Sequence, residues 1–173
     1  HKPYCDGSHI RTGFDGTEAA GHQPFDTLAE KNEGPDLVLW DTEKLCAAAR
    51  FCHRAGDAWT LTERSDDPKA KAIAIQEVAD CPSGRLVARD KKTGQPIEPS
   101  LAPSISLVED PANGVSGPLW VKGGIPITDA NGKPYEVRNR VTLCRCGKSE
   151  NKPFCDAAHI EAHFNDGDSS LNV

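Results

Sequence analysis

The sequence predicts an α+β fold divided into small units rather than one large domain. Short apolar segments of strand period and of helix period follow one another along the 173 residues. Hydrophobic residues make up 37% and aromatic residues 6% of the chain, which leaves little material for a large core. The 15 glycines and 13 prolines indicate many turns, and a turn-rich chain with a small core needs added ties such as metals or disulfides.

The expected order of elements in the middle of the chain is strand, helix, strand, helix, strand. Residues 37–40 form a short apolar strand, and Asp41 then caps a helix that runs to about Cys52. Residues 59–62 alternate as a second strand. Asp67 followed by Pro68 begins a second helix, and residues 85–88 form the third strand.

The last third of the chain is expected to be mainly β. Prolines at 96, 99 and 103 mark a connection, and strands follow at 105–108, 119–122, 125–128 and 136–143. Asn131 and Gly132 are a hairpin turn signal between the last two of these strands.

Charge and hydropathy exclude two classes of partner. The chain has 20 Lys and Arg against 26 Asp and Glu, for a net charge of −6, so we expect no nucleic-acid binding. No apolar run reaches the ~20 residues of a transmembrane helix, so we expect no membrane insertion.

The seven cysteines are an odd number and cannot all pair in disulfides within the chain. They fall into three groups: Cys5 alone, then Cys46, Cys52 and Cys81, then Cys144, Cys146 and Cys155. Two groups carry a histidine at the same offset from a cysteine, as in metal sites.

The last group places four possible ligands within sixteen residues: Cys144, Cys146, Cys155 and His159. A loop that returns through Pro153 brings Cys155 back toward the first two thiols. Asp156 is expected to cap a short helix that begins near Ala157, and His159 then lies one turn after Cys155 on the same side. The pattern predicts a site of three thiolates and one imidazole.

This segment resembles the CDGSH, or NEET, iron–sulfur family, with the pattern C-x-C-x2-[ST]-x3-P-x-C-D-G-[STA]-H. The matching residues are Cys144, Cys146, Ser149, Pro153, Cys155, Asp156 and His159. The chain departs at Ala157, where the family has glycine, and we expect the Cβ to be tolerated on a helical backbone. The resemblance implies a 2Fe-2S cluster held by the four ligands, while a structural zinc ion is the alternative.

The first group is an internal repeat of the last. Residues 2–9 repeat residues 152–159, with Cys5 and His9 in place of Cys155 and His159. The matching C-x-C would lie before His1, so we expect a truncated CDGSH copy that holds a second 2Fe-2S cluster partly through upstream ligands. The alternative is a relic with a free thiol. Two copies are expected to pair as a pseudo-dimer within one chain.

The middle group keeps the first and third positions of a ferredoxin C-x2-C-x2-C run at Cys46 and Cys52, with Ala49 in the second position. Cys81, followed by proline, supplies the closing ligand. This stretch resembles the divergent single-cluster ferredoxins, and its order of elements is ferredoxin-like. Three thiolates suit a 3Fe-4S cluster; a 4Fe-4S cluster would need a further ligand from His53, Asp57 or a small molecule. Buried structural thiols are the other alternative.

These observations divide the chain into four parts: residues 1–22 end a first CDGSH module, 23–35 are a linker, 36–95 are a ferredoxin-like single-cluster domain, and 96–173 are a second CDGSH module with a β-cap. No catalytic triad, phosphate loop or carboxylate pair is present, so we expect an electron carrier rather than an enzyme. A cluster donor or store is the alternative, and a zinc-stabilised scaffold is a third. We expect a monomer in the reducing cytoplasm, with redox proteins or apo acceptors as partners.

Overall fold

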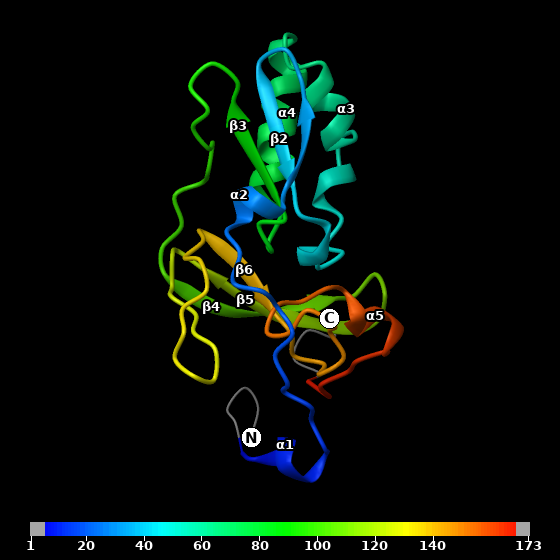
Figure 1. The fold of residues 1–173 in the computed structure, drawn as a ribbon. Coiled ribbons are helices and arrows are strands. Elements are labelled where there is room, and N and C mark those ends of the chain that lie inside the picture. The colour runs from blue at the N-terminus through cyan, green and yellow to red at the C-terminus, as the bar shows by residue number, and fades with distance from the viewer. Residues whose placement is uncertain (1–5, 169–173) are drawn as a thin grey trace.

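The computed structural model describes residues 6–168 and has two three-stranded antiparallel sheets, one in each of two units (Figure 1). The expected α+β class is confirmed. The first sheet has the order β1 (Glu30–Glu33), β2 (Leu37–Asp41), β3 (Leu86–Asp90), and the second has β4 (Ser104–Asp110), β5 (Val115–Lys122), β6 (Arg140–Leu143). Short helices α1 (Ser8–Arg11), α2 (Phe25–Leu28) and α5 (Ala158–Glu161) lie outside the sheets. Within residues 6–168, no helix has the length and apolar character needed to span a membrane.

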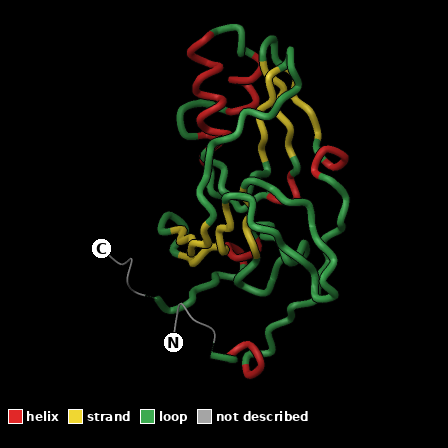
Figure 2. Tube along the Cα trace, turned by 90° about the vertical axis from the view of Figure 1, so that its left-hand side faces the viewer, coloured by secondary structure: helices red, strands yellow, loops and turns green. Residues whose placement is uncertain are grey.

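Two helices cover one face of the first sheet, α3 (Ala58–Glu63) and α4 (Pro68–Ala79), as Figure 2 shows. Asp67 caps α4 by accepting a hydrogen bond from the Lys69 amide at 3.1 Å, and Pro68 stands in the first turn as expected. The core between helices and sheet contains Leu39, Ala58, Val78, Leu86 and Ala88. Cys52 and Cys81 pack against this core, so two predicted ligands sit at its edge.

The order of elements in this unit differs from the prediction. It is strand, strand, helix, helix, strand, because residues 59–62 are helical and β1 forms within the segment expected as a linker, which also holds α2. The Asp57 carboxylate accepts a hydrogen bond from the Thr60 amide at 3.0 Å and so caps α3. This cap, with burial of Ala58, Leu61 and Thr62 at helical spacing, outweighs the strand propensity of the segment.

The helix expected from Asp41 to Cys52 is absent. The chain there forms two short 3-10 turns, Glu43–Leu45 and Phe51–His53, joined by an irregular loop. Ala48 and Arg50 have φ values of 53° and 63°, in the left-handed region that an α-helix cannot contain. The loop therefore turns sharply between the two cysteines that flank it.

The second sheet is shorter than predicted. Residues 125–128 form no strand and make only one bridge, from Thr128 to Pro134, across the expected turn at Gly132. The last strand begins at Arg140 rather than at 136. Side chains of residues 136–139 instead contact other segments: the Glu136 carboxylate accepts a hydrogen bond from the Phe25 amide at 2.7 Å.

A buried arginine joins the two units. Arg140 on β6 is 2% exposed and donates to the backbone carbonyl of Cys81 at 2.6 Å and of Val78 at 2.9 Å. Its guanidinium also pairs with Glu98. A strand of the second unit therefore fixes the end of α4 and the residue predicted to close the middle metal site.

Candidate metal centres

The C-terminal centre is built on the loop that follows β6. The Cys144 amide donates to the Pro153 carbonyl at 2.8 Å, and the Cys155 amide donates to the Thr142 carbonyl at 2.9 Å. These two bonds bring the end of the loop back beside its start. They place Cys155 next to Cys144, as the return through Pro153 predicts.

The four predicted ligands lie in two pairs. The Sγ atoms of Cys144 and Cys146 are 3.7 Å apart, and Cys155 Sγ is 3.5 Å from His159 Nδ1. A tetrahedral metal with bonds of ~2.3 Å to sulfur and ~2.0–2.1 Å to nitrogen has ligand–ligand edges of roughly 3.4–3.8 Å. Each pair thus has the spacing of two ligands on one metal. Within residues 6–168, no three His, Cys, Asp or Glu side chains lie where a single ion would be held. The three thiols and one imidazole are donors that can hold iron or zinc.

Burial sets the protonation of this centre. Burial raises the pKa of the Cys155 thiol to about 12, although a hydrogen bond from the Ala157 amide at 3.4 Å opposes the rise. Burial also lowers the pKa of His159 below its ordinary value, which favours the neutral imidazole that binds metal. In the absence of metal the Cys155 thiol keeps its proton near neutral pH, so binding of iron at Cys155 must release that proton.

Ala157 departs from the expectation of a helical backbone. Its φ and ψ are 73° and 2°, so it lies in the left-handed region, and α5 begins one residue later. Ala157 is therefore the residue at the N-cap position, where Asp156 was expected. Asp156 lies one residue earlier and accepts a hydrogen bond from the Ala158 amide at 3.1 Å. The centre keeps its shape at the cost of a strained non-glycine residue beside a ligand.

The described part of the first motif repeats this backbone. Gly7 has φ and ψ of 78° and 8°, close to the values of Ala157, and the Ser8 amide donates to the Asp6 carboxylate at 3.0 Å, as Ala158 does to Asp156. The Phe14 amide donates to the His9 carbonyl at 3.1 Å, and its counterpart Phe164 donates to the His159 carbonyl at 3.0 Å. Cys5 lies outside the described residues.

The first motif also contacts the loop of the C-terminal centre. The Phe14 ring lies over Gly147, where an added Cβ would come within 2.8 Å of it. The amides of Ala19 and Ala20 donate to the Lys152 carbonyl at 2.8 and 2.9 Å. The N-terminal segment therefore runs along the loop that carries Cys144 and Cys146.

Arg145, between the two thiols, holds this loop to the second sheet. It donates to the Gly117 carbonyl at 2.9 Å and pairs with Glu109 at 2.7 Å and with Asp166 at 2.5 Å. Two carboxylates thus offset its charge. Its main role here is to fix the turn between Cys144 and Cys146.

The middle centre is a small cavity lined by all three predicted thiols, Cys46, Cys52 and Cys81, together with residues 47–51. Burial raises the pKa of Cys52 to about 11, and the neighbouring Cys81 and Cys46 act in the same direction. Arg85 also lines the cavity and is held by Asp41 through hydrogen bonds of 2.6 and 2.8 Å. The hydrogen bonds to Asp41 raise the pKa of Arg85, and a weaker interaction with the Cys46 side chain raises it further. Arg85 therefore places a fixed positive charge beside the thiols.

The two side chains considered as a fourth ligand are engaged elsewhere. His53 Nδ1 lies 3.2 Å from the Asp57 carboxylate, and the His53 ring stacks on Trp59 with ring centroids 5.7 Å apart. Asp57 is the cap of α3. Neither residue lines the cavity of the three thiols.

Two of the arginine contacts between the units involve the candidate centres, and neither was predicted. Arg50, in the loop between Cys46 and Cys52, forms two hydrogen bonds of 3.2 and 2.7 Å with Asp110 at the end of β4. Arg50 and His159 line one cavity of about 820 Å³ between the units. The other contact is that of Arg140 with the Cys81 carbonyl. The one feature of the sequence that could have indicated it is a charged residue at the start of an apolar strand.

Comparison with known families finds two matches. Residues 32–91 match the family described as a divergent 4Fe-4S mono-cluster, and residues 116–160 match the iron-binding zinc finger of CDGSH type. The three middle cysteines fall in the first range, and the four C-terminal ligands fall in the second. No curated protein and no solved structure is significantly similar to this chain.

Proposed function

We propose that this iron–sulfur protein is an electron carrier. Its divergent mono-cluster segment and its CDGSH segment each hold a cluster, and the two clusters exchange electrons. The observation that carries the proposal is the joint cavity between the units, lined by Arg50 from the middle centre and by His159 from the C-terminal one. Electron transfer slows steeply with distance, so two centres that share a cavity wall are suited to it.

The C-terminal centre holds a 2Fe-2S cluster. Cys144 with Cys146 binds one iron, and Cys155 with His159 binds the other; the two ligand pairs at 3.7 and 3.5 Å support this assignment. One imidazole in place of a thiolate removes a negative charge and raises the reduction potential relative to an all-cysteine cluster.

The middle centre holds a 3Fe-4S cluster on Cys46, Cys52 and Cys81. Three thiolates complete its three irons, and the engagement of His53 with Asp57 supports the absence of a fourth protein ligand. The family description favours 4Fe-4S as the alternative, with a small molecule on the fourth iron. Electron paramagnetic resonance separates the two, because an oxidised 3Fe-4S cluster is paramagnetic and an oxidised 4Fe-4S cluster of the ferredoxin type is silent.

A second 2Fe-2S cluster is held by the first motif, with Cys5 and His9 among its ligands. The repeat of backbone angles and hydrogen bonds between residues 6–14 and 156–164 supports this part. The two copies form a pseudo-dimer within a monomer. Unpaired thiols used as ligands favour a reducing compartment, which we take to be the cytoplasm, with redox proteins as partners.

The test is rapid-mixing reduction of the anaerobically purified protein, followed separately at each cluster. We expect reduction of one cluster to be followed by transfer to the other within the same molecule, at a rate independent of protein concentration. Release of the 2Fe-2S cluster to an apo-ferredoxin faster than its spontaneous loss would favour the donor function instead. A purified sample that contains zinc and no labile sulfide would exclude both iron–sulfur functions and favour the zinc-stabilised scaffold.

A further inference from the structure

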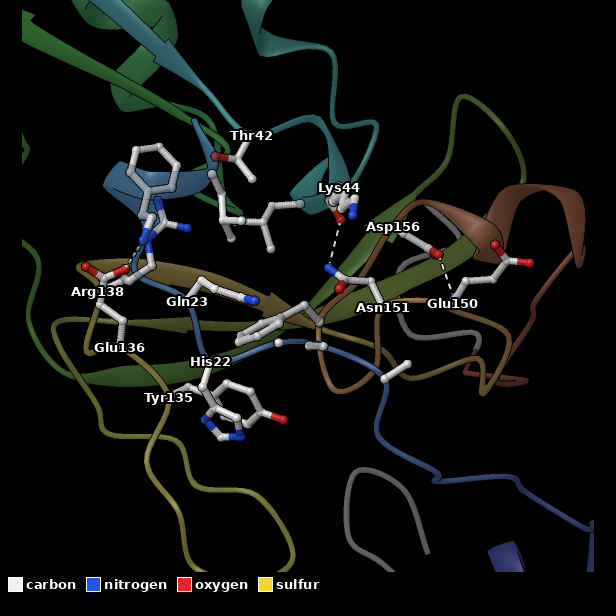
Figure 3. A pocket seen from close by; sticks show the side chains of 17 residues that line it. His22, Gln23, Thr42, Lys44, Tyr135, Glu136, Arg138, Glu150, Asn151 and Asp156 are labelled. Atoms are coloured by element: carbon white, nitrogen blue, oxygen red, sulfur yellow. Dashed lines mark hydrogen bonds between the residues drawn. The ribbon is translucent and has the colours of Figure 1, made fainter. Parts of the chain in front are cut away.

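The middle centre is attached to the second unit at two of the segments that carry its cysteines. Asn151, in the loop of the C-terminal centre, donates from its side chain to the Lys44 carbonyl at 3.0 Å, just before Cys46 (Figure 3). Arg140 donates to the Cys81 carbonyl at 2.6 Å. Neither of these contacts involves the loop that follows Cys46.

The Arg50 side chain holds that loop. Its guanidinium donates to both carboxylate oxygens of Asp110, at 3.2 and 2.7 Å. A bidentate pair of this kind fixes orientation as well as distance. The Arg50 backbone has φ and ψ of 63° and 11°, a left-handed conformation that a non-glycine residue keeps where its surroundings impose it. The pair with Asp110 is a contact from outside the loop that can impose it.

The second sheet fixes the position of Asp110. The Asn113 side chain donates to the Asp110 carboxylate at 2.8 Å, and the Asn113 amide does so at 3.3 Å. Asp110 is also paired with Val115 in the register of β4 and β5. The helix α5, which carries His159, packs against β5. Arg50 is therefore anchored to the same sheet that supports His159.

The two charges of the pair act on different centres. Arg50 lines the small cavity of the three middle thiols, which places its positive charge beside them. Asp110 and His159 line the cavity of about 820 Å³ between the units. Burial lowers the pKa of His159, and Asp110 is the strongest of the charged groups that oppose this effect. The negative charge of Asp110 therefore acts on a ligand of the C-terminal centre.

We propose that Arg50 and Asp110 are positioning residues for electron exchange between the two centres. Their ion pair holds the loop between Cys46 and Cys52 against the sheet that supports His159, and their opposite charges cancel each other between the clusters. The role in electron exchange rests on the proposed function, since it requires a cluster in each segment. The hold on the loop does not.

The first measurement is amide hydrogen exchange at residues 47–50 of the full, cluster-loaded chain. We expect exchange about twofold to fivefold faster in Arg50→Gln and in Asp110→Asn, which is the contribution of an exposed ion pair to a local opening equilibrium. The double variant should exchange no faster than either single variant, because both substitutions break the same contact.

The second measurement is the reduction potential of each cluster, from titrations at low salt followed by electron paramagnetic resonance. Arg50→Gln leaves an unpaired carboxylate and should lower the potentials, whereas Asp110→Asn leaves an unpaired cation and should raise them. A unit charge about 10 Å away changes a one-electron equilibrium about twofold at the dielectric constant of water, or by ~18 mV. Opposite signs in the two single variants are a result that loss of structure alone does not produce.

The double variant separates charge from position. Because it carries neither charge, it should keep the wild-type potentials, and the driving force for transfer between the clusters is then unchanged. We expect its concentration-independent transfer rate to fall at least about twofold, because the loop is held in place for less of the time.

Arg54→Gln is the matched control for hydrogen exchange. The Arg54 side chain is 49% exposed, against 48% for Arg50, and lines the same cavity. Its ion pair with Asp80 lies within the first unit, so this substitution should leave exchange at residues 47–50 unchanged.

The proposal would be overturned by unchanged hydrogen exchange in Arg50→Gln or by an equal increase in Arg54→Gln. Potential shifts of the same sign in the two single variants, or an undiminished transfer rate in the double variant, would also overturn it. Failure of the proposed function gives a different result: the wild type contains iron and sulfide for both clusters but shows no transfer within one molecule. Hydrogen exchange and the potentials still test the ion pair in that case.

Discussion

Replacing Ala157 with glycine should stabilise the protein. Ala157 has a φ of 73°, and a side chain in this left-handed region costs about 1–2 kcal/mol. Against this, glycine destabilises the folded state by about 0.5–1 kcal/mol, because it has a larger conformational entropy in the unfolded chain. Taking the middle of each range, the net gain is about 0.75 kcal/mol, which corresponds to a rise of ~1.5–3 °C in melting temperature for a chain of this size.

The assay is thermal unfolding of samples matched in cluster content and pH. Ala162→Gly is the control, because Ala162 has an ordinary φ of −74° at the end of α5 and should lose stability on the same substitution. The reverse change, Gly7→Ala, should destabilise by strain alone, since nothing lies within 4 Å of the added Cβ. A melting temperature that stays the same or falls in Ala157→Gly would refute the reasoning.

Three further predictions concern the centres. Burial lowers the pKa of His159 in the folded protein below the ordinary value of 6.5. As the pH falls through 6.5, the histidine of the unfolded chain is protonated before that of the folded protein. The free energy of unfolding is therefore highest above pH 6.5 and decreases as the pH falls below it. Cluster absorbance should decay faster below pH ~6 and more slowly in His159→Cys, and equal decay rates would contradict this. Arg145→Gln leaves two carboxylates without their cation and should speed cluster loss at least ~10-fold, whereas the nearby Lys148→Gln should change it little. Arg140→Met should cost about 3 kcal/mol and weaken the middle cluster's spectrum, although Arg140 lies outside residues 32–91; an unaltered spectrum would show that it does not position Cys81.

The sequence predicts best where the causes are local. Asp67 and Pro68 start α4 as expected, because a cap and a fixed φ act within one turn. The C-terminal centre is equally local: its four ligands lie within sixteen residues, and two backbone hydrogen bonds close the loop. These features need little from the rest of the chain.

The sequence does not predict the local structure where contacts between distant residues determine the backbone conformation. The loop between Cys46 and Cys52 has helix-forming alanines, yet Ala48 and Arg50 take positive φ values, and Arg50 is tied to Asp110, sixty residues away in the chain. Arg140 reaches the carbonyl of Cys81 across the boundary between the units, and no spacing rule connects those two residues. Residues 59–62 fail for a nearer reason, since the cap at Asp57 outweighs strand propensity.

Anomalous diffraction at the iron absorption edge tests most directly whether the two segments each hold a cluster. We expect one group of peaks between the Cys144–Cys146 and Cys155–His159 pairs, and a separate group beside Cys46, Cys52 and Cys81. Iron density at only one of these places, or at neither, would contradict an electron carrier that works between them.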